Sequence, residues 1–320
     1  MELLNLNPIN LLHQAHPLFH IGLLLLCGYV GGKIANYLKA PRVSGYIVTG
    51  ILLSPSILGV FHEELVKEEL TIVTDMALGV IAFSIGGTLE LTRLKRLGKH
   101  IFWITIVQAL AAVLLTTAVI AAFLPLIYKP EMSFWGVYFP MAIVIGAVSA
   151  ATAPAATLAV IHEYKARGPL TTILLGIVTL DDGLTILFYA FAIAVARSLI
   201  TQVPLSWHTI LIIPGLHIVI ALALGGAVGL CMRMVIHIVP RREAMLGVMV
   251  GSIFLTSGLA LTLHSSPLLA NMVVGFVVVN FVRHGEDLFG VVEAVEESLF
   301  MMFFTLAGAH LDLHVIQTAG

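Results

Sequence analysis

The chain has 320 residues, of which 59% are hydrophobic and only 11% charged, with a formal net charge of -2. Together with a mean hydropathy of +1.04, this composition excludes a soluble globular domain and indicates a polytopic membrane protein. Cys27 and Cys231 both lie in apolar runs, so they predict neither a disulfide framework nor a metal-binding spacing. We expect no cofactor, no resident metal and no nucleic-acid partner.

Ten apolar segments are long enough, at roughly 20 residues each, to be membrane-spanning helices. In chain order they are residues 16–38, 44–60, 70–89, 100–127, 134–161, 169–196, 208–236, 244–262, 266–282 and 294–311. Short connections, several with proline, separate them. The sequence therefore predicts an all-α fold in a single transmembrane domain over residues 1–320.

The basic residues follow the alternation of these segments. Alternate loops hold 13 of the 16 Lys and Arg residues, and the opposite loops hold only Lys67, Lys129 and Arg197. Because loops rich in Lys and Arg stay in the cytoplasm, this bias places the N-terminus outside the cell. We expect a multi-pass protein of the cell membrane.

A proline interrupts the fifth segment. Pro154 has no backbone N–H to donate, so it would leave the carbonyl oxygen of Ala150 without its helical partner. The hydroxyl groups of Ser149, Thr152 and Thr157 lie around this gap. Such oxygens suit a monovalent cation such as Na⁺ or Li⁺. The alternative is a plain proline kink whose hydroxyl groups bond back to their own helix.

Two adjacent carboxyl groups, Asp181 and Asp182, lie near the centre of the sixth segment. Charged side chains at this depth are costly and are commonly functional. Neighbouring helical residues point about 100° apart, so we expect one carboxyl group to face the ion path and the other a protein partner. Such a pair can gain and lose a proton, as proton-coupled exchange requires. The alternative is a polar contact between helices with both groups protonated.

Other polar residues in the spans have simpler interpretations. Gln108, Asn271 and Asn280 are expected to connect helices by hydrogen bonds rather than to bind ions. Asp75 is expected near the outer boundary of the membrane.

Two short segments resemble each other, Gly86–Leu91 and Gly308–Leu313, and the spans before them also match, at Gly45–Gly50 and Asn271–Gly275. The predicted topology gives the two copies opposite orientations, which is typical of the inverted repeats of secondary transporters. Three spans follow the first copy and none follows the second before Gly320. We therefore expect the chain to be a C-terminally incomplete version of a longer protein.

Four segments together resemble the monovalent cation/proton antiporter superfamily, on its Kef-type and NapA-type branch. They are Pro41–Pro55, Ala151–Thr157, Leu180–Gly183 and Phe303–Asp312. The resemblance implies a transporter rather than an enzyme, and a homodimer of thirteen-helix subunits in a lipid bilayer. It also implies a mobile core at about residues 70–196, with dimerisation elements at about 16–60 and 208–282.

The resemblance also implies roles for the site residues. The residue matched by Asp182 binds the cation or the proton in that family. An aspartate at the position of Asp181 accompanies electrogenic exchange of Na⁺ or Li⁺ for H⁺, whereas K⁺/H⁺ exchangers usually carry Gln there. Thr152 and Pro154 match the crossing of the broken helix, but Ala153 stands where many relatives carry Asp or Ser. The alternatives are a Kef-like K⁺/H⁺ antiporter and, from another class, a non-transporting membrane sensor or regulatory fragment.

Overall fold

The computed structural model describes residues 15–62, 64–127, 133–202, 208–236, 242–282 and 285–311. Over these ranges the regular structure is helical and contains no strand, which confirms the all-α expectation. The chain divides into two compact units. Unit 1 comprises Met1–Ile81, Ala155–Ala166 and Asp287–Gly320, and unit 2 comprises Ala82–Pro154 and Arg167–Glu286. The predicted division into core and dimerisation elements stays a prediction.

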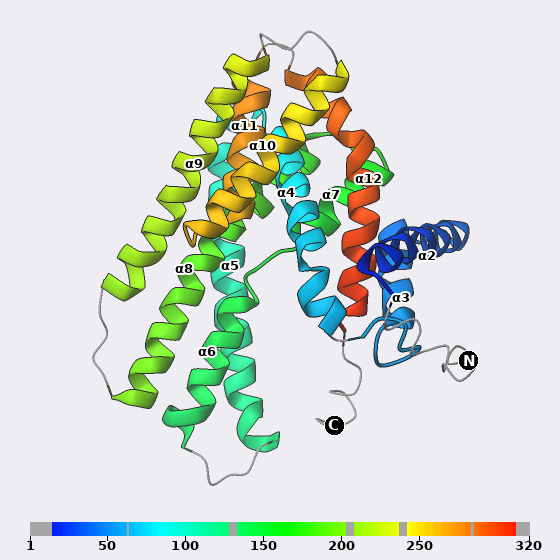
Figure 1. Ribbon diagram of the computed structural model, residues 1–320. Helices are drawn as coiled ribbons and strands as arrows, with labels where there is room; N and C mark the ends of the chain where they lie inside the picture. Colours follow the sequence, from blue (N-terminus) through cyan, green and yellow to red (C-terminus); the bar gives the residue numbers. More distant parts are fainter. Residues whose placement is uncertain are drawn as a thin grey trace, which may run out of the picture. The chain divides into compact units, whose positions relative to one another are not determined.

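The helices follow the predicted segments (Figure 1). They are α2 (Pro17–Tyr37), α3 (Arg42–Leu53), α4 (Thr71–Gly87), α5 (Leu91–Ile127), α6 (Phe139–Val148), α7 (Pro154–Glu163), α8 (Pro169–Thr201), α9 (Ile213–Ile236), α10 (Arg242–Thr262), α11 (Pro267–Phe281) and α12 (Gly285–Ala309). Short π-helical turns precede three of them, namely η2 (Leu65–Glu69) before α4, η3 (Phe134–Tyr138) before α6 and η4 (His208–Ile212) before α9.

Within the described ranges, 5 helices are long and apolar enough to cross a membrane. These are α2, α8, α9, Leu94–Ile127 of α5 and Ala244–Thr262 of α10. The other helices are shorter or more charged, so the predicted number of ten spans is not confirmed. Asp312, part of the sequence repeat, lies outside the described residues.

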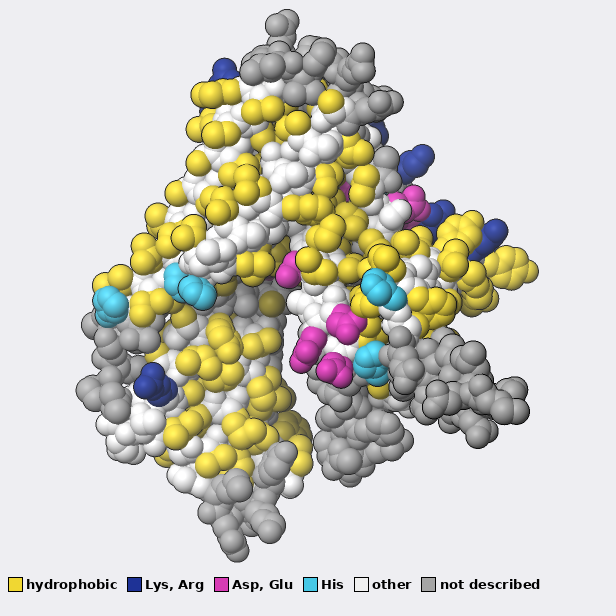
Figure 2. Space-filling model, viewed as in Figure 1, with side chains coloured by type: hydrophobic (Ala, Val, Ile, Leu, Met, Phe, Trp, Pro, Cys, Tyr) yellow, Lys and Arg dark blue, Asp and Glu magenta, His cyan; other side chains and the backbone are white. Residues whose placement is uncertain are grey.

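Hydrophobic side chains cover the outer surface of the long helices in unit 2. Figure 2 shows them over much of the visible face of α8 and α9. On α9, Leu216, Val219 and Met234 are more than half exposed. On the buried side of the same helix, a Cβ at Gly229 would lie 2.7 Å from Val277 Cβ of α11. Large residues therefore face outward, as a lipid-contacting surface requires, while small residues allow close helix packing.

Unit 1 contains a glycine-mediated contact between α3 and α12. A Cβ at Gly50 would overlap the carbonyl oxygen of Thr305, and a Cβ at Gly308 would overlap the carbonyl oxygen of Ile47. The two backbones therefore meet without intervening side chains. Only glycine permits such an approach at these positions.

The same contact occurs again in unit 2, between α11 and α4. A Cβ at Gly275 would overlap the carbonyl oxygen of Phe83, and a Cβ at Gly86 would overlap that of Met272. We call these four residues, Gly50, Gly86, Gly275 and Gly308, the contact glycines. In both units, each overlapped carbonyl belongs to the residue three positions before the contact glycine of its own helix. Gly275 thus corresponds to Gly50, and Gly86 to Gly308. The packing reproduces the register of the sequence repeat and supports the inverted-repeat fold.

Asn280 of α11 fixes the connection between α4 and α5. Its Nδ2 donates to the carbonyl oxygen of Leu89 at 2.9 Å, and its Oδ1 accepts from the backbone N–H of Leu91 at 2.6 Å. The side chain thereby satisfies backbone groups at a point where one helix ends and the next begins. Asn271, also on α11, donates to Ser257 Oγ of α10 at 2.8 Å. Both residues connect helices, as the sequence predicted.

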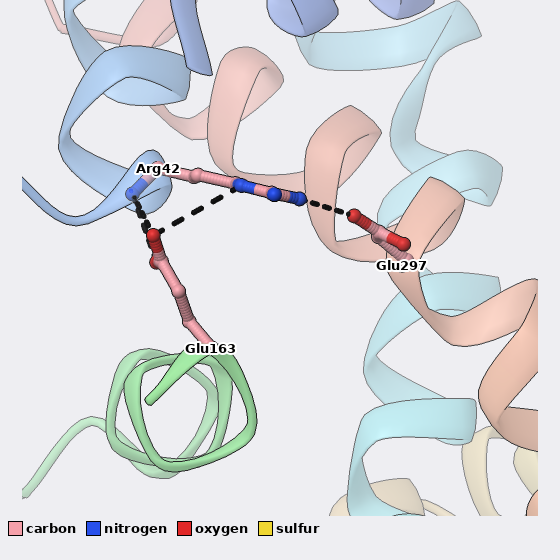
Figure 3. Close-up of polar contacts among 3 residues, drawn as sticks. All are labelled: Arg42, Glu163 and Glu297. Carbon is pink, nitrogen blue, oxygen red and sulfur yellow. Dashed lines mark hydrogen bonds and ion pairs between the residues drawn. The ribbon is translucent and has the colours of Figure 1, made fainter. Parts of the chain in front are cut away.

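In unit 1, a carboxylate of α7 caps the N-terminus of α3 (Figure 3). The N-cap residue Pro41 provides no side-chain hydrogen bond. Instead, the backbone N–H of Arg42 donates to Glu163 Oε2 at 2.9 Å, while Arg42 Nη1 forms an ion pair with Glu297 Oε1 of α12 at 2.8 Å. A carboxylate at a helix N-terminus is stabilising because it satisfies a free N–H and interacts well with the helix dipole.

Glu163→Ala should therefore lower the thermal unfolding midpoint in detergent more than Glu297→Ala does. The first change removes the cap of α3, which typically contributes about 1 kcal/mol. The second removes only an ion pair of an exposed carboxylate, whose side chain is 67% exposed, and such pairs contribute little. Equal midpoints for the two variants would contradict the capping role.

Candidate functional site

The fifth predicted span is interrupted over several residues. Helix α6 ends at Val148, residues 149–150 form a turn, residues 151–153 have no regular structure, and α7 begins at Pro154. At the first position of a helix, proline loses no hydrogen bond, because that N–H has no helical acceptor anyway. The interruption is therefore wider than the single missing hydrogen bond expected from the sequence. The two helices also fall in different compact units.

The three hydroxyl groups predicted around the break have different environments. Thr152 Oγ1 donates to Asp181 Oδ2 at 2.9 Å. Ser149 Oγ donates to the carbonyl oxygens of Gly146 at 2.6 Å and Ala112 at 3.2 Å, so it bonds to backbone rather than to the aspartates. Thr157 is half-buried on α7, in unit 1, whereas both aspartates are in unit 2. Of the two hydroxyl groups that belong to unit 2 with the aspartates, that of Thr152 donates to Asp181 and that of Ser149 does not.

Asp181 lies on the buried face of α8 and is completely inaccessible to solvent. Gln108 Nε2 of α5 donates to both of its carboxylate oxygens, at 2.7 Å to Oδ1 and 2.6 Å to Oδ2. With the Thr152 hydroxyl, three hydrogen bonds from two other segments reach this one carboxylate. Such donors compensate the cost of burying a carboxyl group.

Close packing of α5 against α8 positions Gln108. Thr105 and Ala109 of α5 are both almost fully buried, and a Cβ at Gly176 of α8 would lie 2.8 Å from Ile101 Cδ1. Gln108 is on the same side of α5, within one turn of both buried residues. Gly176 thus lets α5 approach α8 closely. Asp181 lies about one and a half turns after Gly176 on α8, where it meets the side-chain amide of Gln108.

Asp182 has a contrasting environment. Its Oδ2 is buried, and no hydrogen-bond donor lies within reach of it among the described residues. One turn further along α8, the buried Thr185 Oγ1 is likewise without a partner in that part of the structure. Residues three apart are neighbours on a helix surface. One side of α8 therefore carries a carboxylate oxygen and a hydroxyl oxygen whose hydrogen-bonding capacity is unused.

Sequence reasoning found the aspartates but not all of their surroundings. It placed Gln108 correctly as a residue that connects helices, without identifying Asp181 as its partner. It did not single out Thr185, although its spacing from Asp182 was a usable signal. Over the described ranges, no group of three or more His, Cys, Asp or Glu residues is placed to hold a metal ion.

A separate polar cavity of about 300 Å³ lies in unit 1. Its lining includes Arg42, Tyr46, His162, Glu163 and Glu296. His162 Nδ1 lies 3.9 Å from Glu296 Oε2. None of the predicted site residues lines this cavity.

Comparison with known proteins identifies the family. The sequence matches the family described as "Sodium/hydrogen exchanger, transmembrane" over residues 21–320. The fold is similar to that of the sodium proton antiporter MjNhaP1 from Methanocaldococcus jannaschii at pH 8, with a TM-score of 0.64 and 20% sequence identity. That match covers 94% of this chain and 72% of the other. No curated protein matches the sequence. The chain therefore belongs to the sodium/hydrogen exchanger family, within the monovalent cation/proton antiporters.

Proposed function

We propose that this protein exchanges Na⁺ or Li⁺ for protons across the cell membrane by alternating access, and that Asp182 carries the exchanged ion. The observation behind this assignment is the buried Oδ2 of Asp182, which has no donor within reach among the described residues. A buried carboxylate oxygen without a donor is costly unless a proton or a cation neutralises it. Because the two ligands compete for the same oxygen, binding of one releases the other.

Asp181 has a different role in this proposal. Its carboxylate is satisfied by Gln108 and Thr152, so it is a fixed charge beside the exchanging group rather than a second carrier. Thr152 links it to the unwound residues between α6 and α7. Non-helical backbone at membrane depth is tolerated where it is buried in protein or lines a cavity. We propose that residues 149–153 line the ion path and that Pro154 ends the break by starting α7.

The remaining assignments rest on the family and on the distribution of charge. The positive-inside bias supports an N-terminus outside the cell. A homodimer is proposed from family membership alone. The aspartate at position 181 disfavours exchange of K⁺. The experiment below therefore compares K⁺ with Na⁺ and Li⁺.

The test is ion-dependent proton flux in proteoliposomes that contain the purified protein. An imposed proton gradient should be dissipated by Na⁺ and by Li⁺, and much less by K⁺. If K⁺ dissipates the proton gradient as well as Na⁺ does, the proposed preference for Na⁺ and Li⁺ is wrong. The absence of flux with all three ions, in protein that is demonstrably folded and inserted, would contradict exchange by this chain.

A further inference from the structure

The two aspartates differ in how much of their hydrogen-bonding capacity is used. A carboxylate accepts at about four lone-pair positions, two on each oxygen. Asp181 Oδ2 accepts from both Gln108 and Thr152, and Oδ1 accepts from Gln108. Both oxygens of Asp181 therefore already accept from protein donors, the Gln108 amide being shared between them. Asp182 Oδ2 accepts no hydrogen bond from the described residues.

The chemistry of the Gln108 side chain accounts for this difference. An amide nitrogen is a donor only, and it is neutral. It can satisfy a carboxylate without adding positive charge, and it competes with a cation for the same oxygen atoms. Both contacts are short, 2.7 and 2.6 Å, and both come from one nitrogen atom on a helix packed closely against α8. Gln108 therefore fixes the orientation of the Asp181 carboxylate as well as occupying it.

We propose that Gln108 is a positioning residue that keeps Asp181 out of the ion's coordination, so that the transported cation meets one carboxylate rather than two. The inference rests on the proposed role of Asp182 and deepens it. Without the amide, Asp181 would keep only the Thr152 hydroxyl as a donor. Its freed oxygens would then become available to a cation bound at the neighbouring Asp182. Gln108 thus holds the cation affinity low enough for release.

The experiment measures Na⁺ affinity through Na⁺-dependent thermal stabilisation of purified protein, because this readout does not require turnover. Gln108→Met keeps the length of the side chain and removes its donors. At alkaline pH, where protons compete least, it should bind Na⁺ about tenfold more tightly, since a hydrogen bond to a charged group contributes a comparable factor. In proteoliposomes the KM for Na⁺ should fall by a similar factor, and the maximal rate should fall because release is slower.

The matched control is Thr105→Val. Thr105 lies on the same side of α5, but its hydroxyl donates to the carbonyl oxygen of Ile101 in its own helix. This variant should bind Na⁺ like the parent protein. Unchanged or weaker Na⁺ affinity in Gln108→Met would overturn the proposal. If that variant does not fold, Gln108→Asn, whose amide is one bond further from Asp181, should show a smaller increase in affinity.

A double-mutant cycle separates this proposal from a merely structural role. If Gln108 acts through Asp181, Gln108→Met should have no effect on Na⁺ affinity in an Asp181→Asn background. An equal effect in both backgrounds would show that Gln108 acts by another route. The proposed function is tested separately, and it fails if Asp182→Asn still exchanges ions. If Asp182→Asn loses exchange but Gln108→Met has the same effect with and without Asp181, only the role of Gln108 is rejected.

Discussion

Asp182→Asn is expected to reduce Na⁺- and Li⁺-dependent proton flux to the background of empty liposomes while leaving the protein folded. Asparagine has nearly the same shape, so the packing of α8 should be retained. Its neutral amide can neither take up a proton nor offer a charged oxygen to a cation. The effect should be large because Asp182 Oδ2 is the buried oxygen of the pair that has no donor among the described residues. Flux measured in proteoliposomes, with Na⁺-dependent thermal stabilisation alongside, checks both steps.

The control for this variant is Asp75→Asn. Asp75 is a half-buried carboxyl group on α4, in the part of that helix that belongs to unit 1, whereas Asp181 and Asp182 belong to unit 2. Its substitution also removes one carboxyl group from a helix, but it should leave the flux close to that of the parent. Near-normal turnover in Asp182→Asn would remove the central assignment. Equal losses in both variants would indicate a general effect of removing helix carboxylates.

Alanine at any of the four contact glycines should strongly destabilise the protein. At Gly50, Gly86, Gly275 or Gly308 the added Cβ would overlap a backbone carbonyl oxygen of the neighbouring helix. Backbone cannot move aside as a flexible side chain can, so the helices must separate. Overpacking of this kind typically costs about 1–3 kcal/mol. The thermal unfolding midpoint in detergent should fall clearly for each of the four variants.

Two other glycines provide the matched controls. At Gly226 of α9 and Gly247 of α10, an added Cβ would meet no atom within 4 Å. Alanine is also the better helix former of the two residues. Gly226→Ala and Gly247→Ala should therefore keep or slightly raise the unfolding midpoint. A midpoint lowered equally by contact and control substitutions would show that the loss comes from glycine removal in general rather than from the repeated contact.

Local sequence determined the helices and many of their ends. Apolar segments of membrane length predicted the all-α fold because backbone polar groups in lipid must be satisfied within a helix. Prolines marked several starts, since Pro17, Pro154, Pro169 and Pro267 stand at the first position of their helices, where a missing N–H costs nothing. The inverted repeat was also visible, through the glycines at 50, 86, 275 and 308.

Only the tertiary structure showed what those glycines contact and which aspartate has partners. The repeated carbonyl contacts join helices more than 180 residues apart in the chain, and local patterns do not specify such pairings. Gln108 and Asp181 are 73 residues apart in the chain. They meet because α5 packs closely against α8 at Gly176, with the Gln108 side chain on the face of α5 that contacts α8. Two adjacent aspartates look equivalent in a sequence. Helix packing makes them different, because it places donors on one side of α8 and none, among the described residues, beside Asp182 Oδ2.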